Sequence, residues 1–335
     1  MLPSAPTASA APDDVPGDAH FDLARARARL AADALTADWQ LSFVSETGST
    51  NADLLARLGA LTRVAADADP LSRPAQAPRP ECLVAGTQRA GRGRQGRPWQ
   101  SPPGNGLLCS TAMVVEAPVG SLSSLSLVAG AALVTALRSL PLTAPERIAL
   151  KWPNDVLLDG RKLAGILIEL AAARHGRAAL VIGVGINLRA TPVATPPAVA
   201  DRAAGAATDA QHATAPTAPS ALSALTARSA LSRASLDELI AATPDFAGDV
   251  LVAWLVELAR SIALFERAGF APFRDVWWRN HAYAGQAVTL FDQGQPTLGG
   301  IAAGIDETGR LLIDDGTSVR PVSSGDLSLR LSTQP

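Results

Sequence analysis

The segment AGRGRQGRPWQSPPGN (90–105) constrains the fold most, because it holds a dinucleotide-binding glycine pattern in an unsuitable context. Gly91, Gly93 and Gly96 satisfy G-x-G-x-x-G. In a dinucleotide-binding fold the third glycine opens a helix after the first strand. Here Pro98 and then SPPGNG follow, which argues against a sustained helix. The sequence therefore excludes a Rossmann-type domain and predicts an irregular loop between two strands.

This loop carries Arg92, Arg94 and Arg97 at near-alternating positions. Guanidinium forks and exposed backbone amides are suited to phosphates and carboxylates. The alternative is a solvated basic loop with no ligand. Trp99 follows the arginines and is either a hydrophobic plug or a platform for a base or ring.

Lysine and asparagine are rare in this chain. Of 29 basic residues 27 are arginine, and the two lysines are Lys151 and Lys162. This avoidance, beside heavy use of Ala, Arg and Pro, indicates a bias toward GC-rich codons. A planar guanidinium does not mimic a compact ammonium, and a carboxylate cannot donate as an amide does. The surviving lysines and asparagines are therefore candidate functional residues. The asparagines are Asn51, Asn105, Asn154, Asn187 and Asn280.

Both lysines belong to the segment KWPNDVLLDGRKLAGILIEL (151–170). The Asn154–Asp155 pair follows a proline turn at a strand end, and such oxygen ligands suit Mg²⁺, which keeps waters and binds phosphates. Lys162 enters an apolar strand, where a charge is costly unless it meets an anion. A lysine that snorkels from a strand end is the alternative.

Two shorter segments add polar groups and space. GSTN (48–51) offers two hydroxyls and an amide at a helix start, more than simple capping requires. VIGVGINL (181–188) has Gly183 and Gly185 inside a strand, next to Asn187. Strand glycines mark the close approach of a ligand or simply tight packing.

Other functional classes lack support in the sequence. Cys82 and Cys109 have no CxxC spacing, and we expect buried free thiols. The four histidines lack ligand spacing, and no nucleophile elbow occurs. The formal net charge of -2 gives no basic footprint for nucleic acid. No targeting peptide is evident, and no apolar run is expected to span a membrane. We expect a cytoplasmic enzyme that brings two substrates together and stabilises charge, as in phosphoryl or nucleotidyl transfer.

Strand patterns alternate with a few helical ones. Helical periodicity is expected over 20–35, from Ser49 or Thr50, over 122–140 and over 248–280. Short strands between Tyr283 and Leu331, broken by DQGQ, DETG and DDG turns, are typical of a small β-barrel. The expected strands of the first part are 39–46, 82–88, 106–115, 147–152, 162–171 and 178–188.

GSTN, Gln88 with GRGRQGRPW, KWPNDV with KLAGIL, and GVGIN occur here in order, and together they resemble the biotin protein ligases. The resemblance covers residues 40–190, with 245–331 as the remainder. It implies an α/β (α+β) fold: a mixed-sheet catalytic domain of the biotin/lipoate ligase type followed by a small SH3-like β-barrel. It also implies that the substrates are biotin and ATP, used with Mg²⁺. Biotinyl-5′-AMP forms first, and a lysine of a biotin carboxyl carrier protein then attacks it.

The resemblance also implies residue roles. Lys162, which bridges the biotin carboxylate and the α-phosphate, and Arg94 would be catalytic. The biotin-binding residues would be Ser49, Thr50, Asn51, Gln88, Gly91, Arg92, Arg94, Lys162 and Gly183. The nucleotide-binding residues would be Arg94, Arg97, Trp99, Lys151, Asn154 and Asn187, with Asp155 at the metal.

We expect an N-terminal extension (1–37), a catalytic domain (38–280) with a low-complexity insertion (190–235), and a C-terminal domain (281–335). The family's bifunctional members carry an N-terminal DNA-binding domain, for which the stretch before Trp39 leaves no room. The expected partners are carrier proteins of acetyl-CoA carboxylase and similar carboxylases, with no specific DNA and no membrane. We expect the protein to be either a monomer or a homodimer. The alternatives are a lipoate or octanoyl transferase of the same superfamily and a biotin-sensing DNA-binding regulator.

Overall fold

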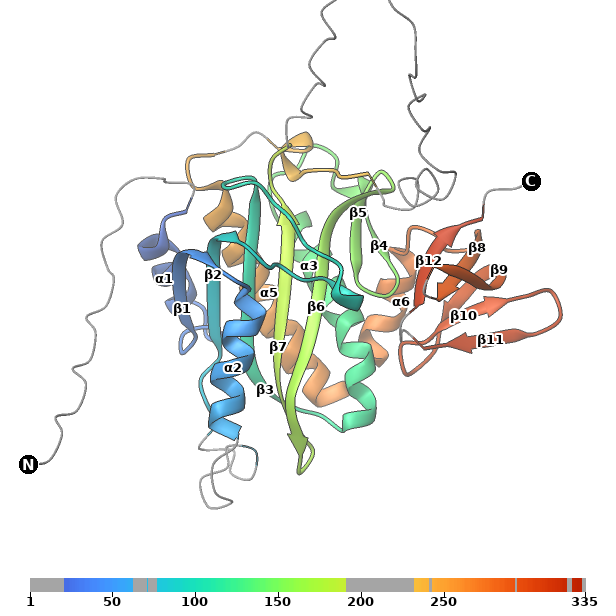
Figure 1. Cartoon of the computed structure of the whole chain (residues 1–335), viewed down its shortest axis with the longest axis horizontal. Helices are drawn as coiled ribbons and strands as arrows, with labels where there is room; N and C mark the ends of the chain where they lie inside the picture. The colour runs from blue at the N-terminus through green and yellow to red at the C-terminus, as the bar shows by residue number, and fades with distance from the viewer. Residues whose placement is uncertain are drawn as a thin grey trace, which may run out of the picture.

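The computed structural model describes residues 21–62, 71, 77–190, 232–240, 243–292, 294–323 and 327–332. A large sheet with helices on both faces forms the first part of the chain, and a smaller sheet lies beside it at the C-terminal end (Figure 1). The predicted α/β class with a mixed sheet is confirmed.

The large sheet has seven strands in the order β1-β2-β3-β7-β6-β5-β4. β1 and β2 are parallel, and all other neighbours are antiparallel. The sequence predicted three strands between 147 and 188, but the structure has four, because the four-residue β5 between two turns is too short to show periodicity. The strands are β1 (Gln40–Thr47), β2 (Glu81–Gln88), β3 (Gly106–Glu116), β4 (Ile148–Lys151), β5 (Asp155–Leu158), β6 (Arg161–Arg174) and β7 (Arg177–Asn187).

Helices cover both faces of this sheet, and alternate side chains point to each face. α2 (Thr50–Thr62) packs on one face, over Leu83 and Val181. Cys82 and Ile182, their neighbours in sequence, belong to the core on the other face. That face is covered by α1 (Leu23–Ala31), α3 (Leu125–Arg138), α5 (Phe246–Ala268) and α6 (Ala271–Arg279). Short 3₁₀ turns are η3 (Arg94–Gly96), η4 (Val119–Ser124), η5 (Pro145–Arg147) and η6 (Leu236–Glu238).

The helical periodicity predicted over 248–280 is confirmed, and the structure divides it into two helices. α5 ends at Ala268, before Gly269 with its φ of +64°, and α6 begins at Ala271. The segment Val119–Arg138 is apolar and long enough to cross a membrane, which the sequence analysis had not expected. In the structure α3 packs between the sheet and α5, and its composition is that of a core helix.

The C-terminal sheet is antiparallel, in the order β11-β10-β9-β8-β12. Its described strands form an open five-stranded sheet, without the β11–β12 pairing that would close the predicted barrel. Main-chain bonds join this part to the edge strand β4: Leu150 donates to Asn280 O (2.7 Å), and Ala282 donates to Leu150 O (2.7 Å). The strands are β8 (Ala287–Asp292), β9 (Gln295–Ile305), β10 (Leu311–Asp314), β11 (Val319–Val322) and β12 (Leu327–Leu331).

Two expected boundary segments contain structured residues. Residues 1–20 lie outside the described residues, but α1 within the expected 1–37 extension packs on α5, where Arg29 Nη1 lies 2.6 Å from Asp249 Oδ1. Of the expected insertion 190–235, residues 191–231 lie outside the described residues. Its last residues are described and buried, since Ala234 and Ser235 are each 3% exposed.

Candidate active site

A cavity on the α2 side of the large sheet brings together most of the predicted site residues. The loop after β2, the β4–β5 turn and the middle of β6 and β7 surround it, and Ser328 and Leu329 of β12 complete its wall. The predicted residues that line it are Ser49, Thr50, Asn51, Gln88, Arg92, Arg94, Arg97, Trp99, Lys151, Asn154, Asp155, Lys162 and Gly183.

Gly91 and Asn187 were predicted for the site but do not line the cavity. Gly91 is buried in the loop, where a Cβ atom would lie 2.6 Å from Trp99 O, so only glycine fits. The Asn187 side chain donates to two main-chain carbonyl oxygens, those of Lys162 and Ala234, each at 3.0 Å. Both act on the shape of the site from behind it.

One end of the cavity is a chain of buried hydrogen bonds that begins at the start of α2. Thr50 N–H donates to Gln88 Oε1 (2.8 Å), and the Thr50 and Ser110 hydroxyls are 2.6 Å apart. Ser110 donates to Asn51 Oδ1 (2.5 Å), which uses its only proton, so Thr50 is the donor to Ser110. Ser49 caps the helix, since its Oγ accepts from Ala52 N–H (3.4 Å).

Glu169 closes this chain on the far side. Asn51 Nδ2 donates to Glu169 Oε2 (2.8 Å), and Arg92 of the loop lies 3.5 Å from Glu169 Oε1. A Cβ atom on Gly183 would lie 2.0 Å from Asn51 Oδ1, which explains the glycine at that strand position. Ser110 and Glu169 were missed by the sequence analysis, because each is a single polar residue in a strand pattern with no local motif around it.

The indole of Trp99 lines the cavity and packs on two paired glycines. Gly165 of β6 and Gly185 of β7 face each other across the sheet, and Cβ atoms there would lie 3.0 Å and 2.4 Å from the indole. Lys162 Nζ lies 5.3 Å from the ring centre, within the range of a cation–π contact. Among the described residues Trp99 Nε1 has no hydrogen-bond partner.

Asp155 lies between the two lysines of the chain. Its Oδ1 is 2.7 Å from Lys162 Nζ, and its Oδ2 is 3.5 Å from Lys151 Nζ. Burial opposes the Asp155 charge, but the two ammonium groups outweigh burial and hold the pKa of this carboxyl below its ordinary value. Burial lowers the pKa of Lys151, and Asp155 partly restores it. One anion therefore supports two cations, and the cluster has an excess positive charge.

Arginines extend this positive charge toward the smaller sheet. Arg94 Nη1 lies 3.5 Å from Asn154 Oδ1, and Arg97 lines the same part of the cavity. Arg330 of β12 lies over the Phe291 ring at 4.2 Å, and burial, then the charge of Arg97, lowers its pKa. The arrangement can bind adjacent anionic groups, one beside Lys162 and another beside the arginines.

We expect Asp155→Asn to reduce the free energy of unfolding by about 3 kcal/mol at about pH 7, because it leaves two lysines facing each other without their anion. The depressed pKa of Asp155 means that its stabilising effect is full above the ordinary aspartate value of 3.8 and is lost as the pH falls through the depressed value. Urea unfolding of both proteins across this range measures the difference.

Asp159→Asn is the matched control, since Asp159 pairs with Arg147 on an exposed turn. It should cause a much smaller loss, because exposed pairs contribute little. Equal losses for the two variants, or a loss for Asp155→Asn that persists unchanged in acid, would show that the Asp155 charge does not hold the lysine pair.

Comparison with known proteins identifies the family of this chain. Residues 68–187 match the biotin/lipoate A/B protein ligase family, and residues 283–330 match the biotin protein ligase C terminal domain. The biotin–[acetyl-CoA-carboxylase] ligase of Mycobacterium tuberculosis is 34% identical, over 86% of this chain and 88% of that protein. The bifunctional ligase/repressor BirA of Escherichia coli is 31% identical, over 75% of this chain and 66% of BirA.

A solved structure supports the same relationship. The biotin protein ligase from Aquifex aeolicus, in complex with biotin and ATP, is 26% identical with a TM-score of 0.54, covering 88% of this chain and 99% of that one. Sequence, fold and the C-terminal domain thus agree on one family. The chain belongs to the biotin protein ligases.

Proposed function

We propose that the cavity catalyses the ATP-dependent adenylation of biotin and the transfer of the biotinyl group to a lysine of a biotin carboxyl carrier protein. The observation that carries this proposal is the Lys162–Asp155–Lys151 cluster, which lies between a hydrogen-bonding end at Thr50 and the arginine-lined end. The relatives named as biotin–[acetyl-CoA-carboxylase] ligases support the choice of biotin and of the carrier.

The Thr50 end suits the ureido ring of biotin, a small planar group with two N–H donors and one carbonyl acceptor. Gln88 Oε1 accepts from Thr50 N–H, while the Gln88 amide nitrogen donates to none of the described residues and remains for a ligand. Ser49, Asn51 and Gly183 form the rest of this end. Gly91 and Arg92 belong to the loop that would cover the bound ring.

The other end suits ATP. The Trp99 indole, which packs on Gly165 and Gly185, would offer a face for the adenine, and Arg94 and Arg97 would offer guanidinium groups for the phosphates. Lys151 and Asn154 line the same region. A biotin carboxylate oxygen would attack the α-phosphorus while the bond to pyrophosphate breaks. A carrier lysine would then attack the acyl carbon, and AMP would leave.

Asp155 is the residue that would hold Mg²⁺, with Asn154 beside it. The described residues contain no group of three His, Cys, Asp or Glu side chains, so the donor set does not suit a resident metal held by protein alone. A single carboxylate fits a magnesium ion that keeps waters and arrives with the phosphates. Such an ion neutralises charge on the departing pyrophosphate. Binding of substrate then requires Lys162 to exchange part of its contact with Asp155 for the substrate anions.

With Mg-ATP and biotin, the purified protein should form biotinyl-AMP and label a biotin carboxyl carrier domain. Lipoate and octanoate serve as the matched control substrates, because enzymes of the same superfamily use them on the same fold. Mass spectrometry of the acyl-adenylate distinguishes the products. Adenylation of lipoate with biotin ignored would establish the transferase alternative and exclude the ligase.

Lys162→Ala and Lys162→Arg should both slow adenylation by about 10²-fold or more, a size typical of removing one charge stabiliser. Two anions must approach each other in a partly dehydrated pocket, and a compact ammonium between them offsets their repulsion. The larger planar guanidinium cannot follow both groups of oxygens.

Transfer from separately supplied biotinyl-AMP should fall less, because that step no longer joins two anions. Pyrophosphate release and single-turnover transfer, measured before steady state, separate the two steps. Wild-type adenylation by Lys162→Arg would contradict the bridging role.

We also propose a cytoplasmic enzyme, monomeric or homodimeric, that does not bind operator-like DNA specifically. Arg25 and Arg29 of α1 both pair with Asp249 of α5. The net charge is -2. A mobility-shift assay at physiological salt should show no specific, biotin-dependent complex. A complex that survives a salt titration, which removes non-specific phosphate binding, would contradict this proposal.

A further inference from the structure

Lys162 lies at the point where β6 leaves its regular ladder. Towards β5, Val156 pairs with Ala164 and Leu157 with Lys162, so Leu163 is an extra residue, a bulge. Towards β7, pairing begins only at Ala164 with Ile186. The backbone of Lys162 therefore has a free side where β7 would otherwise continue.

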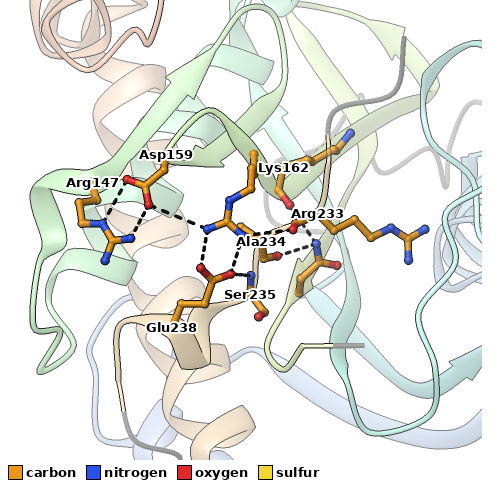
Figure 2. A network of polar contacts seen from close by, with 9 residues as sticks. Arg147, Asp159, Lys162, Arg233, Ala234, Ser235 and Glu238 are labelled. Carbon is orange, nitrogen blue, oxygen red and sulfur yellow. Dashed lines mark hydrogen bonds and ion pairs between the residues drawn. The ribbon is translucent and has the colours of Figure 1, made fainter. Parts of the chain in front are cut away.

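Residues 232–238, here called the strap, occupy that side. Lys162 N–H donates to Ser232 O (2.8 Å), and Ala234 N–H donates to Lys162 O (3.0 Å), forming an isolated parallel bridge. In Figure 2 the carbonyl of Lys162 faces the strap, while its side chain extends away from it. A segment far along the chain thus fixes the main chain from which the ammonium extends.

Asn187, the last residue of β7, fills the junction between β7 and the strap. Its Nδ2 has two hydrogens, and these go to Lys162 O and Ala234 O, both at 3.0 Å. A single amide therefore ties the end of β7, the strap and the start of β6 together. In an aspartate of the same shape an oxygen takes the place of Nδ2, so an acceptor instead of a donor would face the two carbonyl oxygens.

The strap is itself anchored. Ser235 and Glu238 form a capping box, and Leu236 is fully buried. Glu238 also accepts from both terminal nitrogens of Arg161 (3.0 and 2.5 Å), the residue before Lys162. Arg147 and Asp159 extend this network on the exposed side (Figure 2). The strap is thus held at the residue next to Lys162 as well as at Lys162 itself.

We infer that Asn187 is a positioning residue that acts through Lys162, holding its main chain so that the ammonium lies between the two anions of the adenylation step. This inference rests on the proposed role of Lys162. The inference stands on the two hydrogen bonds that Asn187 Nδ2 donates to Lys162 O and Ala234 O, and it adds a positioning role to the nucleotide contact that the resemblance implies.

The test compares the two half-reactions in Asn187→Ala and Asn187→Asp. Adenylation should fall by about 10-fold or more in both, a size expected when a reacting group is misplaced by a fraction of an ångström to an ångström. The KM values for biotin and ATP should change little, and transfer from supplied biotinyl-AMP should stay near the wild-type rate. Asn105→Ala is the matched control, since Asn105 also donates to a main-chain carbonyl at this end of the sheet but not to Lys162.

The decisive measurement is a double-mutant cycle with Lys162→Ala. If Asn187 acts through the ammonium, Asn187→Ala should cause no further loss of adenylation in the Lys162→Ala protein. An additional loss as large as in the wild type, or equal losses in both half-reactions, would overturn the inference.

Two further results keep the proposals separate. Glu238→Gln perturbs the strap at its partly exposed end, and it should cause a smaller loss of adenylation than Asn187→Ala. This loss should again be absent in the Lys162→Ala protein. If both Glu238→Gln and Asn187→Asp adenylate biotin at the wild-type rate, the positioning role is wrong. If Lys162→Ala itself adenylates biotin at the wild-type rate, the proposed function of Lys162 fails first, whatever Asn187 does.

Discussion

The contact of one buried carboxylate with two lysines is the interaction on which the rest of the site depends. Asp155 contacts both ammonium groups, and its charge partly offsets the burial that lowers the pKa of Lys151. With one anion for two cations, the cluster keeps an excess positive charge that attracts anions. An incoming carboxylate or phosphate can replace the Asp155 contact of Lys162 without leaving either lysine isolated. Asp155 therefore holds the two lysines together, and it also leaves Lys162 able to exchange this contact for a substrate anion.

This cluster requires support from three directions. The bulge at Leu163 and the strap direct Lys162, the paired glycines leave room for Trp99 beside it, and the edge of the C-terminal sheet completes the cavity wall. Each support comes from a different part of the chain. Preorganisation of this kind places charge before the reaction begins, so that little reorganisation is needed in the transition state.

The sequence was sufficient for residues whose neighbours along the chain explain them. The GSTN helix start, the arginine loop and the two rare lysines were predicted from local context, and they lie around one cavity. Ser110, Glu169 and Arg330 were not predicted, because each is an ordinary strand residue whose partner is far away in sequence. The sequence predicted the α/β class and the mixed character of the large sheet. The four-residue β5 was missed, and the closed barrel that was expected is an open sheet in the described strands.

Asn187 shows why rarity identifies a residue without identifying its task. Avoidance of asparagine marked the position, and the neighbouring glycines suggested ligand contact. In the structure the amide nitrogen joins three segments that meet only in the folded chain. The strap that it holds lies more than 60 positions after Lys162, beyond any local pattern. The carbonyl oxygens of Lys162 and Ala234 share one donor group, and they require an amide at this position just as a bound ligand would. The scarcity of asparagine therefore identifies a position where an amide is needed, and the tertiary structure shows which groups that amide meets.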